Sequence, residues 1–367
     1  MIMYIWERKD WPDFTWRADR IVGKLTAVRH AQGRLLGRME GLGFRLKQEA
    51  QLQTLTQDVI KSSEIEGERL DADQVRSSIA RRLGMNVAGL VAADRNVEGV
   101  VEMMLDATQN FDRPLTFKRL FDWHGALFPT GRSGMSRIRV GAWRDDADGP
   151  MRVVSGPIGR ERVHYQAPPA ERVAAEMKRF LRWFNADSEI DPVLKSGLAH
   201  FRFVTIHPFE DGNGRIARAI ADLALTRSEA SPQRFYSMSS RIQQERKAYY
   251  DVLEQSQRGT LDITRWLDWF LDCLGRALSD SNATLSGTMR KAKFWERFAK
   301  AGLNARQIKV LGRMLDGFEG KMTSSKWAKL AKSSQDTANR DIQDLIEKGA
   351  LKRGAAGGRS TSYELDL

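Results

Sequence analysis

The segment from His207 to Arg218 has the sequence His-Pro-Phe-Glu-Asp-Gly-Asn-Gly-Arg-Ile-Ala-Arg, and it constrains the fold more than any other part of the chain. Pro208 disfavours a helical backbone at His207, so the apolar helical pattern of residues 192–206 is predicted to end there, with His207 extended. A second apolar helical pattern begins near Gly214. The segment is therefore expected to form an exposed loop that runs into a helix N-terminus.

The residue types in this loop favour an anionic ligand. A helix N-terminus preceded by glycines offers free backbone N–H groups to an anion. Gly212 and Gly214 allow the backbone to approach closely. Arg215 and Arg218 lie three residues apart on one helical face and add positive charge. The segment therefore predicts a site for a polyphosphate.

Three further side chains indicate what reaction such a site could support. Asp211 is a hard oxygen ligand that can hold Mg²⁺ jointly with phosphate oxygens. Asn213 can donate a hydrogen bond to a phosphate. His207 titrates near neutral pH and can accept a proton from a hydroxyl group. Phosphoryl or nucleotidyl transfer is the reaction class indicated. The loop is not a Walker A motif, and the other histidines have no zinc-ligand spacing with His207.

Composition limits the compartment and points to a second activity. The chain has 367 residues, enough for two or three domains, and its single cysteine, Cys273, excludes an intramolecular disulfide and fits a cytoplasmic protein. No apolar run approaches the roughly 18 residues of a membrane helix, so no membrane partner is expected. The net charge is +12, and residues 287–367 hold 17 basic and 9 acidic residues. This basic excess hints at nucleic acid, although a solvated charged face is the commoner explanation.

Hydrophobic periodicity predicts a mainly helical protein. Residues 1–90 are expected to be helical, with a tryptophan-rich start that packs on the rest. A β-hairpin is predicted between residues 151 and 166, and a polar linker over residues 279–288. The further helices are predicted over residues 97–107, 117–128, 173–184, 220–227, 241–257 and 262–278.

The C-terminal segment has the element order of a winged helix-turn-helix. Helices are predicted over residues 304–315, 323–331 and 337–348, followed by a basic hairpin over residues 351–365. A third helix of this kind enters the DNA major groove, and the hairpin lies near phosphates. The alternative is a winged helix used to bind protein. The candidate DNA contacts are Gln335, Thr337 and Arg340 at the helix start, and Lys352, Arg353 and Arg359 on the hairpin.

The segment from His207 to Arg218 resembles the signature of the Fic (Fido) family, His-x-Phe-x-Asp/Glu-Gly-Asn-Gly-Arg-x-x-Arg. The resemblance extends over about residues 97–278. It implies a mainly α fold, with an all-helical Fic core (93–285) that carries a β-hairpin flap, an N-terminal helical domain (1–92) and a C-terminal winged helix (289–367). The matching residues are His207, Phe209, Asp211, Gly212, Asn213, Gly214, Arg215 and Arg218.

The resemblance implies transfer of AMP from ATP, with Mg²⁺, to a Tyr, Thr or Ser hydroxyl of a protein. His207 would be the general base and Asp211 the metal ligand. Residues 212–214 would form the anion hole, with Asn213 on the α-phosphate. The flap would dock a target segment by strand addition. Arg215 would bind the α- and β-phosphates and Arg218 the γ-phosphate, and the other nucleotide-binding candidates are Phe209, Tyr249, Tyr250 and Gln257.

A second family motif lies upstream, in Ser62-Ser63-Glu64-Ile65-Glu66-Gly67. This sequence ends a helix predicted over residues 51–66, and Gly67 is suited to the C′ position. Two acids at the negative end of a helix dipole call for a cationic partner. The resemblance assigns Ser62, Glu66 and Gly67 to an inhibitory motif in which Glu66 pairs with Arg218 and displaces the γ-phosphate. In some family members the same glutamate positions a water that removes AMP, and the sequence leaves this activity open.

Other interpretations remain open at this stage. The chain could be a DNA-binding regulator whose Fic core senses nucleotide, with DNA bound through residues 304–367. It could be a toxin with a separate antitoxin, although a built-in Glu66 motif argues against that need. It could also use another donor, such as a phosphocholine or UMP donor, although the arginine pair favours a triphosphate. Self-modification and a homodimer are further expectations.

Overall fold

The computed structural model describes residues 3–85, 89–147, 149–157, 159–315, 320–354 and 361–366. The chain is mainly α-helical, with three two-stranded antiparallel sheets among these residues. It divides into two compact units, Met1–Ser281 and Asn282–Leu367. The expected fold class, a helical core with a small β-hairpin, is confirmed. In the described part of the chain, no helix is both long and apolar enough to cross a membrane.

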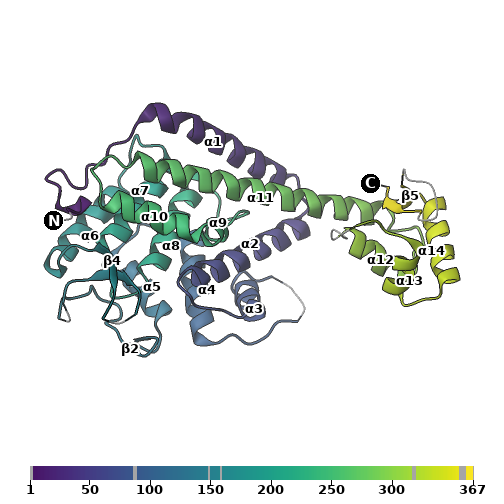
Figure 1. The fold of residues 1–367 in the computed structure, drawn as a ribbon, viewed down its shortest axis with the longest axis horizontal. Coiled ribbons are helices and arrows are strands. Elements are labelled where there is room, and N and C mark those ends of the chain that lie inside the picture. Colours follow the sequence, from purple (N-terminus) through teal and green to yellow (C-terminus); the bar gives the residue numbers. More distant parts are fainter. Residues whose placement is uncertain are drawn as a thin grey trace. The chain divides into compact units, whose positions relative to one another are not determined.

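The N-terminal part of the first unit contains a 3₁₀ turn, η1 (Ile5–Glu7), and helices α1 (Ala18–Glu40), α2 (Phe44–Ile65) and α3 (Ala72–Arg82). The tryptophan-rich start packs on the rest as expected. Trp6 Nε1 donates to Gln166 O at 2.8 Å, and Trp11 Nε1 donates to Glu176 Oε2 at 3.0 Å. Helix α1 lies along the first turns of α11 (Thr264–Arg297) (Figure 1).

The centre of the first unit is built from α4 (Arg95–Gln109), α5 (Phe117–Leu127), α6 (Ala170–Asn185), α7 (Pro192–Ile206) and α8 (Asn213–Glu229). Side chains of Asp94, Thr116 and Asp191 cap α4, α5 and α7 by accepting a hydrogen bond from a first-turn N–H. Helices α7 and α8 pack extensively on each other and are buried on nearly every face. This buried pair carries the loop of residues 207–212 between its ends.

Two hairpins lie between α5 and α6. Strands β3 (Arg152–Ser155) and β4 (Arg162–Gln166) pair as the sequence predicts, with a register shift between Val153 and Val154. The sequence did not predict the short pair β1 (Arg132–Ser133) and β2 (Ser136–Arg137), which lies in a segment expected to be a loop.

Two other predictions are corrected. The helix expected over 241–257 is two helices, α9 (Met238–Gln244) and α10 (Arg246–Gln257), that meet at Glu245. The boundary between the two units falls within the linker expected over residues 279–288, but this segment is helical, because α11 runs through it without a break. Its Ser, Asn and Thr residues are only mildly unfavourable in a helix, and no proline interrupts them.

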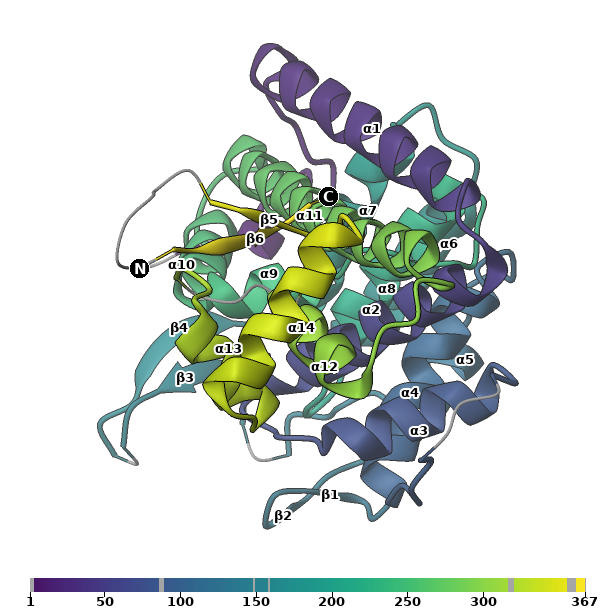
Figure 2. The same ribbon diagram turned by 90° about the vertical axis from the view of Figure 1, so that its right-hand side faces the viewer.

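The second unit contains α12 (Ala305–Leu315), α13 (Ser324–Ala331), α14 (Gln335–Glu347) and the pair β5 (Leu351–Arg353) and β6 (Tyr363–Leu365), in the predicted order. Figure 2 shows β5 and β6 side by side, with α14 next to them. Thr323 and Ser334 cap α13 and α14. The fully buried Trp327 packs in one apolar core with Leu311, Leu345 and neighbouring residues.

Candidate active site

The loop between α7 and α8 begins at His207, whose backbone is left-handed (φ 51°, ψ 59°). The expected extended backbone at His207 is therefore wrong. The left-handed residue ends α7 while its N–H still donates to Phe203 O at 3.0 Å, and Pro208 then follows. A non-glycine residue in this region costs of order 1–3 kcal/mol, which the surrounding hydrogen bonds offset. Gly212 (φ 78°) leads directly into α8.

The His207 ring is oriented to act as a base. Its Nδ1 lies 3.1 Å from Val204 O. A carbonyl oxygen can only accept, so Nδ1 carries the proton and Nε2 keeps its lone pair. Burial lowers the pKa of His207 to about 4, so the imidazole is neutral at pH 7. The neutral ring with a free Nε2 is the form that can take a proton from a hydroxyl group.

Arg144 holds the backbone beside this base, and the sequence did not single it out. Its Nε donates to His207 O at 2.8 Å, and its backbone N–H donates to Pro208 O at 3.0 Å. Nη2 donates to Pro168 O at 2.5 Å. Because its acceptors are mainly backbone carbonyls, no pattern of side chains in the sequence predicts that Arg144 holds this loop.

Asn213 closes the loop. Its Oδ1 accepts from Phe209 N at 3.0 Å, and its Nδ2 donates to Phe209 O at 2.8 Å. The side chain expected on a phosphate is thus already bonded at both ends to the loop backbone. The Phe209 ring, expected among the nucleotide contacts, is fully buried in an aromatic cluster. Both residues shape the loop from inside.

His124 of α5 is a second loop anchor that the sequence did not reveal. Its ring stacks on Phe209 with centroids 4.2 Å apart. Its Nδ1 accepts from Gly141 N at 3.1 Å, so Nε2 carries the proton and donates to Asp211 O at 3.2 Å. Burial lowers the pKa of His124 to about 4 and keeps this tautomer neutral.

Asp211, the predicted metal ligand, is half-buried at the turn. Its Oδ1 accepts from Gly212 N at 2.6 Å, and its Oδ2 accepts from Ser133 Oγ. Mg²⁺ at nucleotide sites takes one or two carboxylates and completes its shell with phosphate oxygens and water. A single carboxylate fits that requirement. Within the described ranges no group of three or more His, Cys, Asp or Glu side chains could hold a metal alone.

The end of α2 has the backbone predicted from Gly67. Gly67 (φ 88°) donates to Glu64 O at 3.0 Å, and Glu68 N donates to Ser63 O at 3.0 Å. These two bonds form a Schellman motif, with Glu66 at the C-cap. The motif fixes the direction of the side chains around Gly67 and turns the carboxylates of Glu66 and Glu68 towards α8.

Glu66 meets Arg218 at the start of α8. Glu66 Oε1 lies 2.8 Å from Arg218 Nη2, and the two side chains are 30% and 2% exposed. Arg218 also donates from Nε to Ser62 Oγ at 2.9 Å and from Nη2 to Ser62 O at 2.8 Å. The sequence motif and the second arginine of the signature thus lie in direct contact.

Arg215 has a partner that the sequence did not suggest. Its Nη1 lies 2.5 Å from Glu68 Oε2, and its Cζ lies 5.0 Å from the centre of the Phe128 ring. Glu68 follows Gly67 directly. The expectation that acids at the end of this helix need a cationic partner could therefore have been applied to Glu68 as well.

The residues expected at the adenine base lie in different surroundings. Tyr249 is buried, with its Oη 2.9 Å from His200 Nε2. Gln257 is buried and donates to Thr205 Oγ1 at 3.3 Å. Tyr250 is exposed, and its Oη lies 3.5 Å from Glu66 Oε2. Of the three, Tyr250 is the side chain available at the surface next to Glu66.

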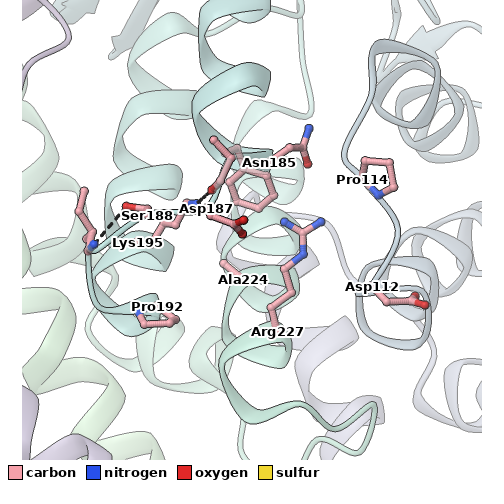
Figure 3. A pocket seen from close by; sticks show the side chains of 12 residues that line it. Asp112, Pro114, Asn185, Asp187, Ser188, Pro192, Lys195, Ala224 and Arg227 are labelled. Carbon is pink, nitrogen blue, oxygen red and sulfur yellow. Dashed lines mark hydrogen bonds between the residues drawn. The ribbon is translucent and has the colours of Figure 1, made fainter.

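A separate pocket of 380 Å³ lies at the other end of α8 (Figure 3). Its cations are held by carbonyl oxygens: Arg227 Nε donates to Phe111 O at 2.7 Å, and Lys195 Nζ donates to Ala186 O at 2.6 Å. None of the predicted site residues lines this pocket. This pocket is therefore not part of the site predicted from the sequence.

In the second unit, the predicted DNA contacts lie at the start of α14 and on β5. Gln335 and Arg340 are exposed, as are Lys352 and Arg353, and Thr337 is half-buried beside the capping residue Ser334. Lys352 also lies 3.8 Å from Asp366. Arg359 lies outside the described residues.

The fold and the site together define a helical protein with a glycine-containing loop between two buried helices and a histidine at the start of that loop. Residues 114–225 match the family model described as Fic/DOC family. Residues 4–85 match a domain of unknown function (DUF4172).

Among curated proteins, the chain is similar to those named protein adenylyltransferase Fic. It is 35% identical over 108 residues to the protein of this name from Drosophila melanogaster. The aligned residues cover 29% of this chain and 20% of that protein. It is 36% identical over 104 residues to the one of Culex quinquefasciatus, which covers 28% and 19%. The match thus spans about a fifth of the length of these relatives.

Solved structures share the fold. A Fic family protein from Desulfovibrio desulfuricans G20 has a TM-score of 0.52 and 22% identity, with 96% of this chain and 98% of that chain covered. A Fic domain containing signaling protein from Bacteroides thetaiotaomicron VPI-5482 has a TM-score of 0.50 and 21% identity, with 71% and 95% covered.

Proposed function

We propose that the chain is a self-inhibited protein adenylyltransferase, which moves AMP from ATP to a hydroxyl group of a protein side chain. The observation that carries this proposal is the convergence of three features at the N-terminus of α8. His207 has a free Nε2, Arg215 and Arg218 bring two positive charges, and the first backbone N–H groups of the helix lack intrahelical acceptors. The named relatives support the same chemistry.

His207 Nε2 takes the proton from the attacking hydroxyl group as the oxygen bonds to the α-phosphorus. The bond between the α-phosphorus and the bridging oxygen then breaks, and pyrophosphate leaves. The N–H groups at the start of α8 stabilise the charge on the α-phosphate, and Arg215 and Arg218 bind the remaining phosphates. Asp211 would hold Mg²⁺, which neutralises phosphate charge when it is bound.

Glu66 keeps this site inactive in the proposal. Its carboxylate occupies Arg218 in the place where a γ-phosphate would bind. Removing one partner of a pair whose other member is buried leaves an uncompensated charge, at a cost of about 3–5 kcal/mol when both are buried. We therefore expect Arg218 to be paired with an anion at all times, either with the Glu66 carboxylate or with a bound phosphate.

The acceptor is proposed to be a peptide segment that adds to the hairpin of residues 151–166, which lies in this unit with one strand edge on each side. The chain itself is included among the acceptors, and a second copy of the chain is a possible source of that segment. The hairpin contacts α10 through His164 Nδ1 and Glu254 Oε2 at 2.6 Å.

Labelling from α-³²P-ATP tests the function. Glu66→Gly should transfer label to itself or to proteins of a lysate, and His207→Ala in that background should abolish the transfer. The proposal fails if Glu66→Gly transfers nothing from ATP while it uses another labelled nucleotide. Incubation of a modified acceptor with the wild type, with release of AMP as readout, tests the reverse activity.

A DNA-binding regulator is the second candidate, favoured by the exposed basic residues on α14 and β5. Salt-dependent binding to a promoter fragment, weakened by Arg340→Ala or Arg353→Ala, would support it. Lack of salt-dependent binding by the wild type would reject this candidate and favour a protein-binding role for the C-terminal unit.

A further inference from the structure

Glu68 is the second carboxylate that the end of α2 brings to α8. Its Oε2 lies 2.5 Å from Arg215 Nη1, and the two side chains are 36% and 6% exposed. Glu68 is two residues beyond Glu66, and Arg215 is three residues before Arg218. The two acids therefore meet the two arginines as separate pairs.

The backbone around Gly67 accounts for both pairs. The Schellman motif places Glu66 at the C-cap and Glu68 at the C″ position, on either side of a left-handed glycine. Acids are unfavourable at the negative end of their own helix dipole, but here both face the positive end of α8. The two carboxylates thus lie where the first turn of α8 attracts anions.

Arg215 needs an anionic partner. Its guanidinium is almost fully buried, and its Nε has no hydrogen-bond partner among the described residues. The Phe128 ring below it contributes a cation–π contact but no charge. A buried cation without a counter-charge is costly, so Arg215 will pair either with Glu68 or with a bound anion.

We propose that Glu68 is a second inhibitory carboxylate, which competes with nucleotide phosphate for Arg215 independently of Glu66. This inference rests on the proposed function, in which Arg215 binds the α- and β-phosphates and Arg218 the γ-phosphate. Removal of Glu66 alone then leaves Arg215 occupied, and inhibition is relieved only in part. Because Glu68 is about one third exposed, a phosphate group can reach Arg215 and replace it.

Equilibrium binding of Mg-ATP and Mg-ADP to the full chain tests the inference. The His207→Ala background prevents turnover, and the variants are Glu66→Gly, Glu68→Gln and both together. We expect Glu68→Gln to increase the affinity for ATP and for ADP by the same factor, about three- to tenfold, whether Glu66 is present or replaced by glycine. Glu66→Gly should increase the affinity for ATP more than the affinity for ADP, because in the proposed function Glu66 occupies the γ-phosphate position.

Glu64→Gln is the matched control. Glu64 lies on the same turn but pairs with Lys61 at 2.8 Å, so its removal should leave nucleotide affinity unchanged. Glu68→Asp keeps the charge on a shorter side chain and should bind nucleotide with intermediate affinity. The Schellman bond of Glu68 uses its backbone N–H, so these variants keep the helix end.

Weaker or unchanged ATP binding on addition of Glu68→Gln to Glu66→Gly would overturn the inference, because Glu68 would then position Arg215 rather than block it. Failure of every variant to bind either nucleotide would instead reject the proposed function. The ratio of ATP to ADP affinities separates the two carboxylates even when all variants bind.

Discussion

The Glu66 carboxylate fills the space that a side chain on Gly214 would need. A Cβ atom on Gly214 would overlap Glu66 Oε1 and would lie 3.0 Å from Glu66 Cδ. Gly214 lies inside α8 with an ordinary helical backbone, so its conformation does not require glycine. A glycine within a helix costs about 0.5–1 kcal/mol relative to alanine. The position is therefore explained by the carboxylate, or by the phosphate that would replace it.

Gly214→Ala should destabilise the protein by about 1–3 kcal/mol, because the new methyl group displaces Glu66 and leaves Arg218 unpaired. Thermal and urea unfolding measure the effect. In the Glu66→Gly background the nearest remaining atom is Arg218 Nη1, 3.3 Å from the new Cβ, and the gain in helix propensity of up to about 1 kcal/mol should largely offset that contact. The same change in stability in both backgrounds would contradict the Glu66–Gly214 contact.

The rate of transfer should depend on pH through His207. Burial lowers the pKa of His207 to about 4. The rate of Glu66→Gly is therefore expected to be flat between about pH 6 and 8 and to fall only below about pH 5. An ordinary histidine would give a midpoint near pH 6.5. Such a midpoint in the measured kcat profile would show that burial does not lower the pKa of His207.

Stability should rise with pH through the buried histidines. Burial lowers the pKa of His200 to about 3, whereas the unfolded chain titrates near 6.5. Between about pH 4 and 6.5 the unfolded state binds more protons, so protonation favours unfolding as pH falls through that window. Burial raises the pKa of Asp222, which acts in the opposite sense.

The difference in the free energy of unfolding between the wild type and His200→Gln isolates His200, because Asp222 is present in both proteins and its contribution cancels. The stability advantage of the wild type should grow from pH 4.5 to 6.5, by at most about 1.4 kcal/mol per pH unit, and stay constant above. Urea unfolding at four pH values measures this. A difference that is independent of pH would mean that His200 titrates alike in the folded and unfolded chains.

Arg144→Lys should lower kcat in the Glu66→Gly background by about 10- to 100-fold with little change in ATP affinity. Lysine cannot reach the carbonyls of His207 and Pro168 together, and small displacements of a catalytic group cost about that factor. Arg139→Ala is the control, since Arg139 forms an exposed pair with Asp145. A matching loss of ATP affinity would indicate a general collapse of the loop instead.

The parts of the site that could be predicted depend on local chain chemistry. Glycines, a proline and two arginines in one segment mark a loop and a helix N-terminus, and Gly67 marks a helix end. The hairpin of residues 151–166 follows from β-favouring runs on either side of a turn. In each case the determining residues are close in sequence.

The missed parts depend on contacts between distant segments. Arg144 and His124 act on backbone oxygens of residues 207–211, which no side-chain pattern encodes. Glu68 gains its partner only when α2 packs beside α8. The bonds of Asn213 to the backbone of Phe209 are a structural role that the sequence did not suggest, and its contact with a phosphate stays a prediction.

In the proposed mechanism, the Schellman end of α2 would also set how often the site is open. If Glu66 leaves only when this last turn unravels, nucleotide binds only the unravelled molecules, and the apparent affinity falls by their fraction. A gap of about 3 kcal/mol would leave fewer than roughly 1% of molecules competent. A partner that peels away one turn of α2 could then raise activity about a hundredfold without contacting the nucleotide at all.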